Sequence, residues 1–500
     1  MDSRLVRRAG GALVIAAVAL VAVWLVLVWV DAAPIGSVHT GDSDNLVAGA
    51  RTAARCITDG HWQACGRIDG TRQSEVFPYP LLQYLPAIPL VWLGWSTPAI
   101  LDTLARLNLV AFAGALALTA LAARRCRPRG IGLLAPLALL CASATYQATS
   151  GFGEMLGATA SLGAVVAVMY RRSALIVVAM ALACLGKETM LPFVLVLGLV
   201  CGREPGDGWF PPARVTKAVG AGVALGLALT VGFNEFRYGT ARNLAYLDPL
   251  FRTPGIARKV EFLAGVWVAP SSGLLWFWPV TVAVLFLGVV AALGAAIRNG
   301  RDLRGWVPAA AVFGTVVAFT MGLAAWLSPF GWIAYGPRLA VPLLPAATVA
   351  MLSAAGPGIA GLVRPVLRSM LGTVVVCAVV VLAGWAQFGA PWSYRESVAD
   401  LLAPDATCAS ITQVVVQDDA ARYYVCTSHV MWRRHPWTLA SAFGDGGRTA
   451  LAGRILLGGA SVLLVLRMRR LLLEPTAAPD TVGDEPETDV DQPVAISPSG

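Results

Sequence analysis

Long apolar segments separated by short polar ones run through most of this 500-residue chain. A run of about 18 or more residues without charges is typical of a helix that crosses a bilayer. The first run, residues 11–30, is preceded by arginines, and no small-residue cleavage site stands out after it. We interpret it as an uncleaved anchor, with a cleaved signal peptide as the alternative. The apolar runs up to residue 466 predict an all-α polytopic membrane protein with about twelve transmembrane helices.

The arginines lie between the apolar runs, and their spacing predicts an orientation. Cytoplasmic loops of membrane proteins carry an excess of lysine and arginine. If the N-terminus is cytoplasmic, every second loop is basic, namely those with arginines in residues 124–129, 171–172, 203, 298–304, 364–368 and 467–470. This alternation predicts a multi-pass plasma-membrane protein with both termini in the cytoplasm.

One apolar segment, residues 79–95, breaks the alternation. Counting it as a span would move the arginines that follow residue 122 to the outer side. The prolines at 78, 80, 86 and 89 also disfavour a straight helix. We therefore expect an interfacial or re-entrant helix on the outer side. Such backbone is tolerated only beside protein or a wet cavity, so we expect a cavity here.

The composition agrees with a membrane location and changes how the charge is interpreted. Hydrophobic residues make up 57% of the chain and charged residues 13%, against roughly 25% charged residues in soluble domains. The net charge of +9 comes from arginines in the basic loops, so it predicts orientation and not nucleic-acid binding. Three lysines beside abundant alanine, glycine, valine and arginine indicate a GC-rich genome, and we expect an actinobacterial source.

Four of the nine cysteines fall in the expected external segments. An oxidising exterior favours two local disulfides, Cys56 with Cys65 and Cys408 with Cys426. The other five cysteines lie in expected spans or on the cytoplasmic side. There we expect them to act as small hydrophobic side chains.

Two carboxylates, Asp42 and Asp44, lie shortly after the first span on the predicted outer side. Residues 45–57 favour a helix, and Asp44 is a suitable N-cap for it, which is the purely structural interpretation. Their place between a membrane anchor and the proline-rich segment favours a catalytic role instead.

Three further charged residues occur at the expected outer edge of the membrane. Lys187 and Arg338 both oppose the usual charge distribution there, which favours an anionic partner such as phosphate. Arginine's planar guanidinium suits a bidentate phosphate contact. The structural alternative for Lys187 is a snorkelling side chain paired with Glu188. Glu154 is either a favourable acidic residue at a helix N-terminus or a second carboxylate of the cavity.

The remaining polar stretches add candidates without a decisive motif. Tyr335 precedes Arg338 in an aromatic turn that an interfacial belt would also explain. Arg237 lies in Asn-Glu-Phe-Arg-Tyr-Gly, which leads into a polar stretch with an expected amphipathic helix. No Walker motif, dinucleotide fingerprint, HExxH or CxxC is present. No cofactor is implied, and a divalent metal remains possible without being required.

Taken in order, these features resemble the polytopic GT-C glycosyltransferases, in the branch of protein mannosyltransferases and lipid A aminoarabinose transferases. That family has an acidic residue and a Gly-aromatic pair in its first external loop, then a proline-rich segment on the membrane and a transmembrane helix. The similar stretches here are Asp42 to Asp44, Gly60-His61-Trp62, Phe77 to Gly94 and residues 98–122. Three later stretches are also similar to bacterial members, namely Asn234 to Gly239, Ser271 to Leu275 and Tyr335 to Arg338. The family commonly shows Asp-Glu where this chain has Asp-Ser-Asp.

The resemblance implies an external active site, a polyprenyl-phosphate sugar donor and inversion at the sugar. It implies that Asp44 or Asp42 deprotonates an acceptor hydroxyl, with Asp44 slightly better spaced from the Gly-aromatic pair. Lys187 and Arg338 would hold the donor phosphate. The cavity residues would be Glu154, Tyr335, Trp62 and Arg237. The expected acceptor is a cell-envelope glycan, lipid or protein.

The expected organisation follows from these segments. Residues 1–388 form a GT-C-like transmembrane catalytic domain with its first external loop at 31–97, residues 389–448 a small external segment, residues 449–470 the last transmembrane helix and its basic flank, and residues 471–500 a disordered cytoplasmic tail. A transporter or flippase of a lipid-linked glycan is the alternative, but its midplane polar groups and inverted repeats are not evident. A non-enzymatic envelope-assembly protein is a third, in which both aspartates are simple caps.

Overall fold

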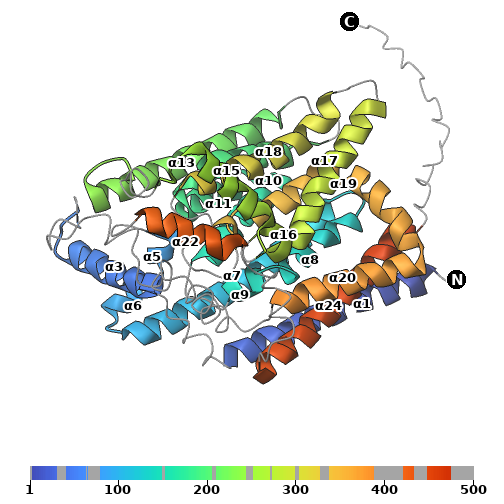
Figure 1. Cartoon of the computed structure of the whole chain (residues 1–500), viewed down its shortest axis with the longest axis horizontal. Helices are drawn as coiled ribbons and strands as arrows, with labels where there is room; N and C mark the ends of the chain where they lie inside the picture. The colour runs from blue at the N-terminus through green and yellow to red at the C-terminus, as the bar shows by residue number, and fades with distance from the viewer. Residues whose placement is uncertain are drawn as a thin grey trace, which may run out of the picture.

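The computed structural model describes residues 3–30, 41–62, 65, 79–148, 153–204, 210–243, 252–270, 273–298, 303–326, 337–387, 420–432 and 447–474. Apart from one isolated bridge between Arg252 and Trp326, these residues form helices and turns. The long helices run roughly along one direction and pack side by side (Figure 1). This arrangement confirms the predicted all-α polytopic class.

Among the described residues, seven helices contain an apolar stretch long enough to cross a bilayer. They are α1 (Ser3–Val30), α7 (Thr97–Arg125), α13 (Ala213–Tyr238), α17 (Pro279–Arg298), α18 (Leu303–Ala325), α19 (Leu344–Arg368) and α24 (Gly447–Leu473). Each of them matches one of the twelve expected spans.

The other five expected spans correspond to shorter apolar helices. These are η2 with α8 (Ile131–Leu133 and Leu134–Leu140), α10 (Glu154–Met169), α11 (Ser173–Gly186), η3 with α12 (Glu188–Met190 and Leu191–Cys201) and α20 (Met370–Gln387). Residues 131–148 depart from the expected continuous helix, because the chain turns after α8 and continues as α9 (Ala144–Gln147). At this turn the Ser143 N–H donates to the Phe277 carbonyl at 2.9 Å, instead of to a carbonyl of its own helix.

The remaining helices of the described residues are outside the expected spans or at their edges. They are α3 (Gly41–Thr58), α5 (Leu81–Tyr84), α6 (Ala87–Trp92), α15 (Ile256–Val268), α16 (Leu274–Phe277), η5 (Arg338–Ala340) and α22 (Ala420–Trp432). The proline-rich segment is therefore two short helices and not one straight helix, as its prolines predict. Its place at the membrane surface stays a prediction.

Contacts of two described arginines join predicted basic loops in pairs at one end of the bundle, which we call the arginine end. Arg125 at the end of α7 lies over the ring of Tyr170 after α10, at 4.5 Å. Arg469 of α24 donates to the carbonyl of Leu367 in α19 at 2.9 Å. The opposite end, where α3, α5 and α6 lie (Figure 1), we call the Glu154 end. The arginine end and the Glu154 end thus lie at opposite ends of the bundle, as the sequence predicts. The side of the membrane that each end faces stays a prediction.

Glycines allow α11, α13 and α10 to approach closely. A Cβ added at Gly222 of α13 would lie 2.8 Å from the carbonyl oxygen of Val177 and 2.6 Å from Cβ of Met180, both in α11. A Cβ at Gly226 would lie 2.6 Å from Cβ of Cys184. Small residues at such contacts let helices in membranes pack by van der Waals interaction.

Replacing Gly222 with alanine should destabilise the protein, because backbone and Cβ atoms of α11 would have to move. We expect the free energy of unfolding to fall by about 1–3 kcal/mol. Gly220 on the same helix has nothing within 4 Å of an added Cβ, so Gly220→Ala should be neutral or stabilising by up to about 1 kcal/mol. Thermal unfolding in detergent compares the two variants, and equal effects would contradict the close approach.

Candidate functional site

The Glu154 end contains a cluster of one carboxylate and two cations contributed by three segments far apart in sequence. Glu154 is the first residue of α10, Lys187 follows the last residue of α11, and Arg338 is the first residue of η5. Arg338 Nε lies 3.2 Å from Oε1 of Glu154. Lys187 Nζ donates to the carbonyl of Leu339 at 2.9 Å. The structure therefore places close together three residues that the sequence analysis assigned to the donor phosphate and the cavity.

The approach of α10 and α11 positions this cluster. A Cβ on Gly186 would lie 2.8 Å from Cα of Gly157, and one on Gly157 would lie 3.4 Å from the carbonyl oxygen of Gly186. Gly157 is one helical turn after Glu154, and Gly186 directly precedes Lys187. Because neither glycine has a side chain, the helices come close enough to place the carboxylate and the ammonium in one site.

The three charged side chains of the cluster are buried, which strengthens the electrostatic interactions among them. The side chains of Arg338 and Glu154 are 7% and 9% exposed, and Lys187 is 8% exposed. Lys187 lies in the turn between α11 and η3, outside the helices, with its Nζ 5.6 Å from the ring centre of Phe319. Burial lowers the pKa of Lys187 to about 8, although Glu154 opposes the shift and Arg338 adds to it. Two cations face one carboxylate here, which favours an anionic ligand.

The proline-rich segment packs directly against the cluster. A Cβ on Gly153 would collide with the side chain of Gln83 in α5, and one on Gly186 would lie 3.4 Å from a methyl carbon of Leu82. Gln83 is 8% exposed. The segment expected to form a cavity wall therefore packs against Gly153 and Gly186, the residues that directly precede Glu154 and Lys187.

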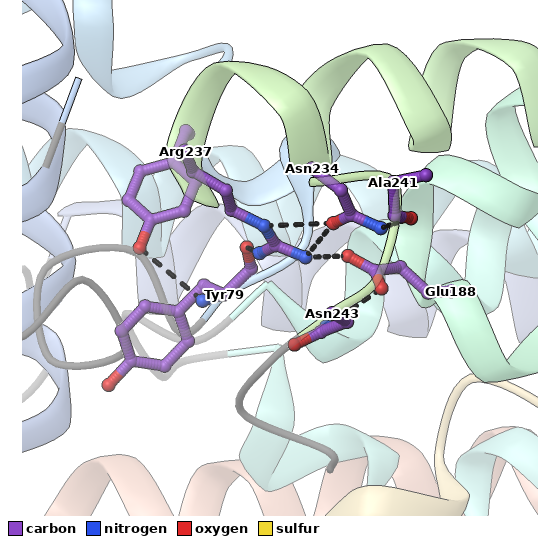
Figure 2. A network of polar contacts seen from close by, with 7 residues as sticks. Tyr79, Glu188, Asn234, Arg237, Ala241 and Asn243 are labelled. Carbon is purple, nitrogen blue, oxygen red and sulfur yellow. Dashed lines mark hydrogen bonds and ion pairs between the residues drawn. The ribbon is translucent and has the colours of Figure 1, made fainter. Parts of the chain in front are cut away.

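A second polar network lies beside the cluster and centres on the fully buried Arg237 (Figure 2). Its guanidinium donates to the carbonyl of Tyr79 at 3.0 Å and, through Nε, to Oδ1 of Asn234 at 3.0 Å. It also forms an ion pair with Glu188, whose other oxygen accepts a bond from Asn243 at 2.7 Å. These contacts join the end of α13 to the start of the proline-rich segment and to η3.

This network corrects one interpretation of the sequence. The structural alternative for Lys187 pairs it with its neighbour Glu188. In the structure Glu188 pairs with Arg237 and Asn243 instead. The two side chains diverge because Lys187 has extended backbone, with φ −164° and ψ 120°, and interrupts the helix between them. Sequence reasoning also did not assign roles to Asn234 and Gln83. The i, i+3 spacing of Asn234 and Arg237 is the feature of the sequence that could have predicted their contact, because residues three apart are neighbours on a helix surface.

The two aspartates lie in the first turn of α3, which begins at Gly41 and not near residue 45 as expected. Asp44 is therefore inside the helix instead of capping it. Nothing further is described of either side chain. One turn on, Leu46 and Val47 are buried in an apolar cluster that also contains Tyr84 of α5. This cluster joins the aspartate helix to the segment that covers Glu154 and Lys187.

The remaining predicted residues have separate outcomes. The disulfide between Cys56 and Cys65 is present and confirms that prediction. Cys426 is also disulfide-bonded, whereas Cys408 lies outside the described residues, as does Tyr335. Trp62 is 62% exposed near the end of α3, and its role in the site stays a prediction. Within the described part of the chain, no three His, Cys, Asp or Glu side chains are grouped as metal ligands would be.

Two solved structures are similar to this chain at low identity. Crystal structures of ArnT from Cupriavidus metallidurans, in the apo state and bound to undecaprenyl phosphate, match it with TM-scores of 0.43 and 0.41 and identities of 16% and 15%. The matches cover 89% and 90% of this chain and 77% of each ArnT chain. No family model matches the chain, and no curated protein matches it.

Replacing Arg237 with methionine should strongly destabilise the protein, because Glu188 would be left without its ion-pair partner. We expect a loss of about 3–5 kcal/mol in the free energy of unfolding. Arg242 is exposed on the same segment, and Arg242→Met should change stability by no more than about 0.5 kcal/mol.

The double variant Arg237→Met/Glu188→Met provides the control for the pairing itself. It removes both charges, so it should recover much of the lost stability. Thermal unfolding of the unaltered protein, Arg237→Met, Arg242→Met and the double variant measures how much the ion pair contributes to stability. An Arg237→Met variant as stable as Arg242→Met would show that the pair contributes little.

Proposed function

We propose that this protein is an inverting glycosyltransferase that moves a sugar from a polyprenyl-phosphate donor to a cell-envelope acceptor at the external face of the plasma membrane. The observation that carries the proposal is the buried cluster of Lys187, Arg338 and Glu154. Glu154 is paired with Arg338 at 3.2 Å, and Lys187 adds a second buried cation, so the described side chains of the cluster are two cations and one carboxylate. An anion such as a phosphodiester would compensate this charge.

Phosphate recognition and a membrane location together favour a lipid-linked donor. The cluster lies at the end of a bundle of apolar helices, beside the short helix α5 of the proline-rich segment. A polyprenyl chain would remain among lipids while its phosphate reaches Lys187 and Arg338. In this proposal Glu154 orients Arg338, and Arg237 positions the proline-rich segment through its bond to Tyr79.

The transfer step needs a base and stabilisation of the leaving group. The acceptor hydroxyl oxygen attacks the anomeric carbon as the bond from that carbon to the phosphate oxygen breaks, and attack from the opposite face inverts the configuration. The hydroxyl proton passes to the carboxylate of Asp44, or of Asp42. Polyprenyl phosphate leaves with the electron pair, and the fixed charges of Lys187 and Arg338 stabilise its developing negative charge.

Alanine at the aspartates should abolish most of the transfer of radiolabelled sugar from a polyprenyl-phosphate donor by the purified protein in detergent. Loss of a positioned base lowers rates by about 10²–10⁴-fold, and we expect the larger effect for Asp44→Ala than for Asp42→Ala. Asp59 is exposed directly after the same helix, so Asp59→Ala should retain activity.

Full activity in both aspartate variants would exclude them as the base. If no donor supports transfer and the protein instead moves a lipid-linked glycan across vesicle membranes, the proposal is wrong and the transporter is correct. Both assays use the full chain, so the two functions are compared on the same preparation.

The value of kcat/KM should fall as the pH rises through about 8, the pKa of Lys187 in the folded protein. Above this pH Lys187 loses the charge that holds the donor, while a phosphodiester stays ionised. The same titration changes the stability of the folded protein in the opposite direction. The unfolded lysine, with a pKa of 10.5, keeps its proton, so stability rises with pH between these values.

Lys187→Arg is the matched variant, because arginine stays charged throughout the pH range in which Lys187 loses its proton. It should keep its kcat/KM at pH values where the activity of the unaltered protein declines. A decline at the same pH in both proteins would assign the titration to another group.

A further inference from the structure

A basic cavity lies at the arginine end of the bundle, away from the proposed active site. It has a volume of 490 Å³, and the residues that line it include Arg125, Arg171, Arg172 and Arg214. They come from the end of α7, the turn between α10 and α11, and the first turn of α13. The described residues that line the cavity include no acidic side chain.

Local contacts hold these arginines in place. Arg125 lies 4.5 Å from the ring centre of Tyr170, and Nε of Arg214 donates to Oγ of Ser173 at 3.0 Å. Arg171 pairs with Glu204 at 3.3 Å. Arg171 also has φ +53°, a left-handed conformation that non-glycine residues adopt infrequently. The cavity is therefore a defined arrangement of cations and not a set of unrelated surface charges.

An apolar groove continues from the basic cavity between α11 and α13. It shares Ser173, Ala174 and Arg214 with the cavity. Its other lining residues are Lys217, which lies one turn after Arg214, and the apolar Val177, Ala218 and Ala221. The exposed Leu175 and Val178 of α11 lie in the same part of the chain, 60% and 55% exposed. Cations at one end and small apolar side chains at the other match an amphipathic molecule.

We propose that this cavity binds the headgroup of an anionic phospholipid, with an acyl chain in the groove between α11 and α13. Arginine guanidinium groups form charge-assisted hydrogen bonds with phosphate oxygens. Basic sites between transmembrane helices are suited to anionic headgroups, and a free phosphate would make no use of the groove. The bound lipid would fasten α7, α10, α11 and α13 to one another at this end.

This site is separate from the proposed sugar-transfer site. The cavity and Glu154 lie at opposite ends of α10, whose 16 residues span roughly 24 Å at 1.5 Å per residue. Failure of either proposal would therefore leave the other intact.

The test is a titration of the delipidated full-length protein in detergent with dioleoyl phosphatidylglycerol, followed by native mass spectrometry. Dioleoyl phosphatidylcholine, which is zwitterionic and has no net charge, is the comparison lipid, and inorganic phosphate is the competitor. Arg125→Gln/Arg214→Gln removes two cations that line the cavity, both of them exposed side chains. Arg124→Gln is the matched control, because Arg124 is exposed next to Arg125 on α7 and does not line the cavity.

We expect phosphatidylglycerol to bind more tightly than phosphatidylcholine, and the double variant to weaken its binding by about tenfold or more. Arg124→Gln should bind as the unaltered protein does. Ala221→Phe fills the groove while all four arginines remain, so it too should weaken binding of phosphatidylglycerol. Because Ala221 is exposed, we expect Ala221→Phe to fold as the unaltered protein does, and the melting temperature checks this.

Equal phosphatidylglycerol binding by the double variant and Arg124→Gln would overturn the proposal. Equal binding of phosphatidylcholine and phosphatidylglycerol would do so as well. If inorganic phosphate displaces the lipid and Ala221→Phe has no effect, the cavity is a site for free phosphate and the lipid assignment is wrong.

Discussion

The ion pair between Arg338 and Glu154 is the interaction on which the Glu154 end depends. Both side chains are less than a tenth exposed, and charges removed from water need partners that offset their lost hydration. Lys187 adds a second cation to the same buried region, held by the Leu339 carbonyl. The cluster is therefore compatible with the fold only if α10, α11 and η5 meet closely, and Gly157 and Gly186 permit that approach. Among the described residues of this cluster, two cations accompany one carboxylate, which suits the binding of an anion.

Two adjacent residues connect this cluster to the structural network beside it. Lys187 contacts the segment that carries Arg338, whereas Glu188 pairs with Arg237 at the end of α13. Arg237 in turn holds the carbonyl of Tyr79, where the proline-rich segment begins. A shift of η3 would thus move the proposed phosphate site and its cover together. This coupling explains how a segment of two short helices is held against the bundle although its prolines prevent a continuous helix.

The two ends of the bundle use positive charge differently. At the Glu154 end, two cations are buried with one carboxylate, so the binding of an anion depends on the position of each of these side chains. At the arginine end, the cations around the 490 Å³ cavity are mostly exposed, and their number matters more than the geometry of any one pair. The first arrangement suits a reacting phosphate, and the second suits a lipid headgroup that holds helices together.

The sequence by itself determined the helical membrane architecture, the alternation of basic loops and the Cys56–Cys65 disulfide. These follow from properties that are local in sequence: apolar runs, arginine spacing and two nearby cysteines. It also singled out Lys187, Arg338 and Glu154, because charges at a membrane edge are unusual whatever their partners. It could not show that these three residues meet, since they are separated by long stretches of chain and their distances depend on how α10, α11 and η5 pack. Likewise only the tertiary structure assigned Glu188 to Arg237 and not to Lys187, because the extended backbone at Lys187 turns the two side chains apart and burial then selects the partner of each.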